Sequence, residues 1–217
     1  MKVSGKGLVE FMRARADRQR SILYTLKFPD EKERASRGSY YSTAKRNIIA
    51  FHRESHPIGW LATQAESIDA KAKTAAKDSE KKRLQSNAKA LRHYAQHFGN
   101  RQFVVQPTAR FGLTIGSVET SVAPELYVSE KGRLQLVKLE FSPQLMAPDV
   151  VQLFLRFLAH AAARNGSPVT PTHCFLYHVP TGDVYRSPGI GSRFVKELEA
   201  ACQTVEDIWD KLKKRAA

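Results

Sequence analysis

The nine residues from 133 to 141 read Arg-Leu-Gln-Leu-Val-Lys-Leu-Glu-Phe, and they decide the fold class. In a β-strand, neighbouring side chains point to opposite sides of the sheet, so a run with this alternation is typical of a strand. One face holds Gln135, Val137, Leu139 and Phe141. The other face holds Leu134, Leu136, Lys138 and Glu140. The pattern therefore predicts a central strand that presents a lysine and a carboxylate on the same face.

A turn at Glu130-Lys131-Gly132 precedes this strand and predicts a β-hairpin. The strand before the turn begins at Glu125, directly after Pro124, and antiparallel pairing would bring Glu125 close to Lys138. Glu119 lies one strand earlier. On spacing alone, an ion pair on a solvent-exposed face is the favoured explanation of Lys138 and Glu140.

The segments after this strand predict the rest of a sheet fold. An apolar run from 149 to 164 follows Pro148 and predicts a helix, the segment 173–186 predicts a second hairpin, and an amphipathic helix starts near Arg193. This order predicts an α/β (α+β) fold, with a central mixed sheet flanked by helices. The helix between strands further predicts one parallel strand pair, joined by a right-handed crossover.

Residues 1–99 predict a helical region in front of the sheet-forming residues 100–217. We expect helices over 5–26 and 42–54, the first ending before Pro29. In 60–98 the small and apolar residues recur every three or four positions, but a wholly polar stretch at 77–83 interrupts them. Either one long helix crosses this stretch or two helices form a hairpin capped by Asp78 or Ser79. We favour the hairpin, because an antiparallel partner would cover the narrow apolar seam.

The charge of the chain is concentrated in this first region. The 217 residues include 35 Lys and Arg against 21 Asp and Glu, a formal net charge of +14, and residues 1–99 hold 21 of the basic and 10 of the acidic residues. Such an excess predicts a polyanionic partner, and nucleic acid is favoured over a membrane. DNA and RNA present the same phosphates, so the charge leaves the choice between them open. The residues expected to contact phosphates are Arg13, Arg15, Arg18, Arg20, Lys45, Arg46, Lys81, Lys82, Arg83 and Arg92.

The composition excludes several classes of protein. Two cysteines cannot build a disulfide scaffold or a four-cysteine zinc site. No apolar stretch approaches the roughly 18 residues of a membrane span, and the first twenty residues lack a signal-peptide pattern, so we expect a cytoplasmic protein. No nucleotide-binding motif is present, and no cofactor is expected from the residues alone.

Residues 102–187 resemble the PD-(D/E)XK nuclease superfamily, especially its RecB-like branch. The likeness rests on Pro124-Glu125-Leu126, on Leu136-Val137-Lys138-Leu139-Glu140, and on a glutamine-led helix at Gln152. The family places Asp where Glu125 stands, and it has its Glu and Lys in the opposite order to Lys138 and Glu140. The resemblance implies Glu125 and Glu140, with Glu119 as a third candidate, as ligands of Mg²⁺ or Mn²⁺. It implies that Lys138 stabilises developing charge and that Gln152 assists.

The reversed order of Lys138 and Glu140 leaves three functions open. The favoured one is a nucleic-acid-binding protein on a degenerate nuclease-like core, which the resemblance places in a multi-component bacterial system for DNA processing, mobile elements or defence. The second is a metal-dependent DNA nuclease with a rearranged site. The third is a non-catalytic adaptor that binds a protein partner through the helical arm 60–98.

Overall fold

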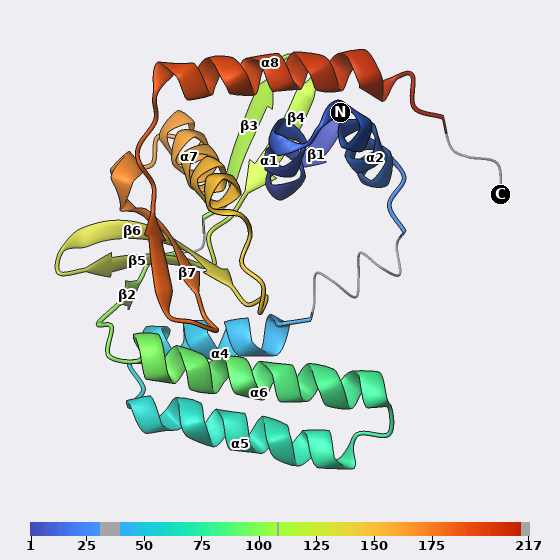
Figure 1. The fold of residues 1–217 in the computed structure, drawn as a ribbon. Helices are drawn as coiled ribbons and strands as arrows, with labels where there is room; N and C mark the ends of the chain where they lie inside the picture. Colours follow the sequence, from blue (N-terminus) through green and yellow to red (C-terminus); the bar gives the residue numbers. More distant parts are fainter. Residues whose placement is uncertain (31–39, 108, 214–217) are drawn as a thin grey trace.

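The computed structural model describes residues 1–30, 40–107 and 109–213, and within those ranges it has seven α-helices and two sheets (Figure 1). The smaller sheet has the order β1 (Lys2–Ser4), β4 (Val118–Val122), β3 (Phe111–Ile115). In it β1 runs parallel to β4, and β3 runs antiparallel to β4. The strand β1 is an addition to the predicted set, since three residues are too few for a periodic signal.

The larger sheet contains the strand that the sequence singles out. Its order is β2 (Val104–Val105), β5 (Leu126–Glu130), β6 (Arg133–Glu140), β7 (Cys174–His178), β8 (Asp183–Arg186). The β6–β7 pair is parallel, and α7 (Pro148–Arg164) and the 3₁₀ turn Pro171–His173 lie between these two strands in the chain. The other neighbouring pairs are antiparallel. The predicted mixed α/β fold with flanking helices is thereby confirmed.

The β5–β6 hairpin turns where the sequence places it. Lys131 and Gly132 have φ angles of 51° and 75°, and Glu130 pairs with Arg133. Two consecutive residues with positive φ match the right-handed twist of the flanking strands, and Gly132 adopts this conformation without steric cost. This turn fixes the register of β5 against β6, so it also fixes which side chains meet across the pair.

The larger sheet is covered on both faces. Leu136 of β6 faces an apolar core formed with α1 (Gly5–Arg13), α7, α8 (Ser192–Trp209) and the smaller sheet. Val137 and Leu139 face a second core formed with the helices of the first half of the chain. Figure 1 shows α7 and α8 on one side of this sheet and, on the other, the stacked helices α4 (Ser42–Arg53), α6 (Asp78–Phe98) and α5 (Ile58–Thr74). The structure therefore confirms the two faces of β6 that the alternating sequence predicts.

The first helical segment differs from the prediction. In place of one helix over 5–26 there are two, α1 (Gly5–Arg13) and α2 (Ala16–Lys27), because Ala14 and Arg15 adopt extended backbone angles. Neither residue is a glycine or proline, so the sequence contains no sign of the break. The first of the two helices, α1, packs closely on α7: a Cβ atom added at Gly5 would lie 2.6 Å from Cε1 of Phe157.

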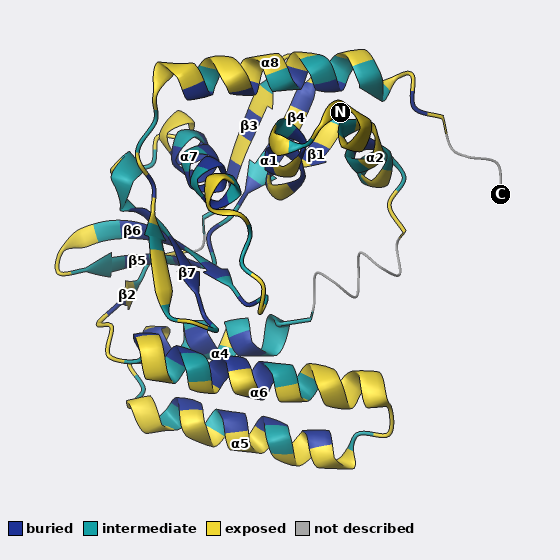
Figure 2. Ribbon diagram, viewed as in Figure 1, coloured by how far each residue is buried: buried dark blue, intermediate teal, exposed yellow. Residues whose placement is uncertain are grey.

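The other helices of the first half are α4 (Ser42–Arg53), α5 (Ile58–Thr74) and α6 (Asp78–Phe98). The segment 60–98 is thus a hairpin of two helices, with Leu61, Ala65 and Ile68 of α5 buried along the seam (Figure 2). The expected cap is wrong: Lys77 holds the N-cap position without a side-chain hydrogen bond, and Asp78 is the first helical residue.

Each apolar core contains residues from both 1–99 and 100–217. Leu8 and Leu23 lie in one core with Phe157, and Leu91 and Phe98 lie in the other with Val137. Residues before and after position 99 therefore pack together, although they differ in charge. None of the described helices is both long and apolar enough to cross a membrane.

Candidate functional site

Glu125 lies opposite Lys138 across the β5–β6 pair. Its backbone N–H donates to the carbonyl oxygen of Val137 (3.0 Å), which extends the ladder by one residue beyond β5. The Lys138 ammonium then donates to Oε1 of Glu125 at 2.7 Å, and the backbone N–H of Leu139 donates to Oε2 at 3.0 Å. The hairpin thus forms a cross-strand ion pair, with Glu125 in place of Glu140 as the partner of Lys138.

A second lysine reaches the same carboxylate from α4. Lys45 Nζ lies 2.9 Å from Oε1 of Glu125, so two ammonium groups share one oxygen atom. Each also lies over an aromatic ring: Lys45 over Phe141 at 5.8 Å and Lys138 over Phe154 at 5.9 Å from the ring centroid. The ring faces attract the cations and hold the two lysine stems in place.

The Glu125 carboxylate is ionised despite its burial. Burial alone would raise the pKa of Glu125, but Lys138 and Lys45 outweigh that effect and hold the pKa below its ordinary value. The side chain of Glu125 is 10% exposed, whereas those of Lys45 and Lys138 are 34% and 26% exposed. The two lysine side chains of this cluster are therefore more open to solvent than the carboxylate that they share.

The Glu140 carboxylate forms its hydrogen bond with a backbone N–H and not with Lys138. Two positions beyond Lys138, it shares the strand face of that lysine, but its Oε1 accepts a hydrogen bond from the backbone N–H of Ser142 at 2.9 Å. Between these described residues no ion pair joins Glu140 to Lys138 or Lys45. Glu140 lies near Tyr41, whose pKa is raised by its own burial, by Tyr40 and by Glu140, and whose ring stacks on Phe141 at 5.0 Å.

The remaining two residues of the predicted site lie apart from this cluster. Glu119 is in β4 of the smaller sheet, opposite Lys2 and Thr114. Gln152 is half-buried on α7. The structure thus brings together Glu125 and Lys138, places Glu140 on the same strand face, and leaves Glu119 in a different sheet.

The arrangement does not suit the Mg²⁺ or Mn²⁺ ion that the nuclease resemblance implies. Such ions need several anionic oxygens that are free to reach them. Both oxygens of Glu125 already accept hydrogen bonds, Oε1 from two cations, and one oxygen of Glu140 is bound to Ser142. Over residues 1–30, 40–107 and 109–213, no group of three or more His, Cys, Asp or Glu side chains is placed to hold a metal.

The basic residues predicted to contact phosphates fall into two groups in space. Arg13, Arg15, Arg18 and Arg20 lie on or between α1 and α2, and the other six lie on α4 and α6 at the opposite end of the molecule (Figure 1). Nine of the ten are exposed, and Lys45 is half-buried. Arg13 pairs with Asp149, Arg92 with Asp69 at 2.5 Å, and Arg83 with Glu80 at 3.9 Å.

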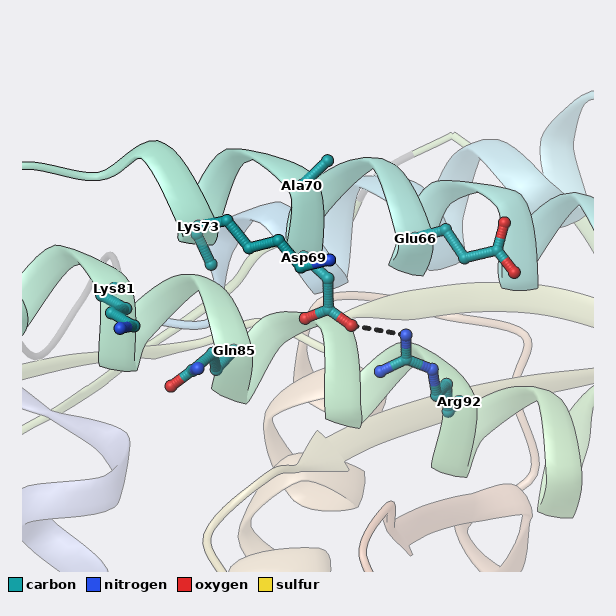
Figure 3. Close-up of a pocket in the computed structure, with 8 residues that line it drawn as sticks. Glu66, Asp69, Ala70, Lys73, Lys81, Gln85 and Arg92 are labelled. Atoms are coloured by element: carbon teal, nitrogen blue, oxygen red, sulfur yellow. Dashed lines mark hydrogen bonds and ion pairs between the residues drawn. The ribbon is translucent and has the colours of Figure 1, made fainter.

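Two surface hollows lie beside these groups. One, of about 620 Å³, runs along α5 and α6; Glu66, Asp69, Lys73, Lys81 and Arg92 surround it, and Arg92 reaches across to Asp69 (Figure 3). The other, of about 400 Å³, is lined by residues of α1, α2 and α7 that include Arg15 and Arg18. Neither hollow includes Glu125 or Lys138. The first presents both signs of charge, which is a weaker feature for anion binding than a purely basic surface.

Sequence reasoning missed how Lys45 acts. Charge alone predicts a phosphate contact for Lys45, and nothing in a sequence links it to Glu125, which is 80 positions away. Asn87 was also missed: it is buried and its Oδ1 accepts a hydrogen bond from the Ala44 N–H at 2.8 Å, which fixes the start of α4 and hence the position of Lys45.

A scan of the chain against models of protein families found no match, and a search of curated protein sequences found no significant similarity.

Proposed function

We propose that this protein binds nucleic acid through its exposed basic helices and does not cleave it. The observation that supports this function most directly is the exposure of nine of the ten basic residues on α1, α2, α4 and α6 and the adjoining segment, in a chain with a net charge of +14. Exposed Lys and Arg groups release condensed counter-ions when they neutralise phosphates, so they supply sequence-independent affinity.

The proposal for the sheet is that it serves as a scaffold and not as a hydrolytic centre. A divalent ion would have to compete with two ammonium groups for Oε1 of Glu125. Displacing both would leave two half-buried cations without their counter-ion, which costs free energy. This supports binding without metal-dependent cleavage.

The salt dependence of binding tests the proposal. With a fluorescent 20-base-pair duplex and the full chain, the affinity measured by anisotropy should fall at least about a hundredfold between 50 and 200 mM KCl, as expected for several phosphate contacts. A flat salt dependence, or no binding at 50 mM KCl, would contradict the proposal. Cleavage of the duplex on addition of Mg²⁺ or Mn²⁺ would contradict its non-catalytic part.

Matched variants show which residues are responsible. Replacing Arg15, Arg18 and Arg20 by Gln, or Lys81, Lys82 and Arg83 by Gln, should weaken binding and reduce the slope of log affinity against log salt by about two to three. The control replaces three other exposed basic residues, Arg164, Lys196 and Lys211, by Gln. It removes the same net charge and should change the slope by less than about one.

A further inference from the structure

The two lysines that share Glu125 are held side by side at the end of β6. Because Lys45 Nζ and Lys138 Nζ both donate to Oε1, at 2.9 and 2.7 Å, the two ammonium groups lie within a few ångströms of each other. They come from a helix and a strand that are far apart in the chain. We propose that Lys45 and Lys138 form a binding site for a backbone phosphate of nucleic acid, with Glu125 as a fixed counter-ion. This inference rests on the proposed function and names one of its contact points.

The lysines retain the donors that a phosphate needs. Each ammonium has three N–H groups. Within the described part of the chain, the one hydrogen-bond acceptor of each ammonium is Glu125. The side chains of Lys45 and Lys138 are 34% and 26% exposed, so both are more open to solvent than Glu125, whose side chain is 10% exposed. Since Glu125 and the two aromatic rings already hold the lysines, a phosphate would bind without the entropic cost of ordering two flexible side chains.

The local electrostatics favour an anion at this position. The ions in direct contact are two lysines and one carboxylate, a net charge of +1. Among the described residues Glu140, the other carboxylate on this strand face, forms no ion pair with either lysine, and its Oε1 accepts a hydrogen bond from the Ser142 N–H. The first turn of α4, which contains Lys45, has no acidic residue, so the positive end of the helix dipole adds to the field.

The site also has the position that ligands occupy in sheets of this kind. Lys138 lies near the carboxyl end of β6, and β6 pairs in parallel with β7 after the intervening α7. Open sheets with parallel strands commonly bind ligands beyond the carboxyl ends of those strands. Lys45 belongs to α4, which also has the exposed basic residue Arg46.

Two other roles for the cluster make different predictions. If Glu125 were a cation ligand, removing its charge would abolish binding of the metal and of any substrate held through it. If the cluster only fastened α4 to the sheet, removing the charge of Glu125 would lower stability and leave nucleic-acid affinity unchanged. A phosphate site predicts tighter nucleic-acid binding by Glu125→Gln, because this substitution removes the one negative charge in contact with the lysines.

The first experiment measures duplex binding by anisotropy at 50 mM KCl for the variants Lys45→Gln, Lys138→Gln and Lys196→Gln. The first two should each weaken binding about tenfold, as for the loss of a charge-assisted hydrogen bond. Lys196, exposed on α8, is the matched control and should change affinity less than about twofold. Equal effects of all three variants would overturn the site. Circular dichroism of each variant shows whether it is folded.

The second experiment uses Glu125→Gln, which should bind the duplex at least about threefold more tightly at 50 mM KCl. Weaker or unchanged binding by a folded variant would overturn the proposal. Should this variant fail to fold, the wild-type chain decides by titration with inorganic phosphate. The amide resonances of Lys138 and Leu139 should shift in a saturable way, while that of the control Lys196 stays fixed. Absence of shifts at Lys138 and Leu139 would overturn the site.

These readouts separate the two proposals. A wild-type chain that fails to bind the duplex, but shows saturable phosphate shifts at Leu139, would overturn nucleic acid as the source of the phosphate and support the anion site. Steep salt-dependent binding that is indifferent to Lys45→Gln and Lys138→Gln would support the proposed function and overturn the site.

Discussion

The Nε2 atom of His52 lies 2.7 Å from the hydroxyl oxygen of Tyr94, in a core where these residues are 5% and 0% exposed. Burial lowers the pKa of His52 to about 4 from its ordinary 6.5, since no carboxylate compensates for the lost solvation of the charged ring. Burial also raises the pKa of Tyr94 well above its ordinary value. Both groups are therefore neutral at pH 7, and one neutral hydrogen bond links α4 to α6.

His52 should make stability depend on pH. The unfolded chain takes up a proton near pH 6.5 and the folded chain only near pH 4, so protonation favours the unfolded state as the pH falls through this window. Between pH 7.5 and pH 5 this one group should lower the free energy of unfolding by about 2 kcal/mol. Urea denaturation at both pH values measures the change, with His52→Gln as the reference. A wild type that follows the pH profile of His52→Gln would contradict the buried neutral state.

Asn87 should contribute strongly to the docking of α4 on α6. It is 1% exposed, it accepts from the Ala44 N–H, and its Nδ2 donates to the carbonyl oxygens of Tyr40 and Arg83 at 2.7 and 2.8 Å. Asn87→Ala removes these three hydrogen bonds and leaves the Ala44 N–H without its acceptor, so it should lower the free energy of unfolding by about 2–4 kcal/mol. Urea denaturation checks this, with the exposed Gln85→Ala on the same helix expected to change stability by less than about 0.5 kcal/mol.

Two glycines should respond differently to the same substitution. A Cβ atom at Gly5 would lie 2.6 Å from the Phe157 ring and 3.1 Å from the carbonyl oxygen of Ser121, whereas one at Gly112 meets nothing within 4 Å. Gly5→Ala should therefore cost about 1–3 kcal/mol through overpacking of α1 against α7. Gly112→Ala, in β3, should be neutral or slightly stabilising. Thermal melts of the two variants give the comparison. Equal melting temperatures would show that α1 shifts away from Phe157 and accommodates the added methyl group without cost.

The two cysteines should be unreactive in the folded protein. Burial raises the pKa of Cys174 to about 12, and burial together with Glu206 and Glu199 raises that of Cys202 to about 11. At pH 8 about one thiol in a thousand or fewer is then ionised, and both side chains are covered. A thiol-specific disulfide reagent should label neither cysteine in buffer and both in urea. Fast labelling of one cysteine in buffer would show that its surroundings open readily.

The fold could be predicted to the extent that its signals are local. The alternation at 133–141 identifies β6 and assigns its two faces, and Lys131-Gly132 locates the hairpin turn with the positive φ angles that it requires. The break at Ala14 and Arg15 has no such signal, since neither residue is a glycine or a proline. Strand β1 also escaped prediction, since its three residues pair as a strand only with β4.

For the candidate site, the sequence predicts the contact that a hairpin dictates and misses those that the tertiary fold creates. Glu125 meets Lys138 because the β5–β6 register is set by a turn between them. Lys45 meets the same carboxylate because Asn87 fixes the start of α4, and this relation joins residues far apart in the chain. Glu119 lies in the other sheet because β3 and β4 pair with β1 and not with β5.

The pairing of β1 with β4 has a consequence for how the chain is made. Lys2 to Ser4 align with Glu119 to Ser121, so the first strand leaves the ribosome long before its partner has been synthesised. Until then β1 and the buried face of α1 have no sheet and no α7 to pack on. The nascent chain therefore exposes this apolar segment at least until residues 118–122 have been synthesised, and contacts of such long sequence separation make folding slow.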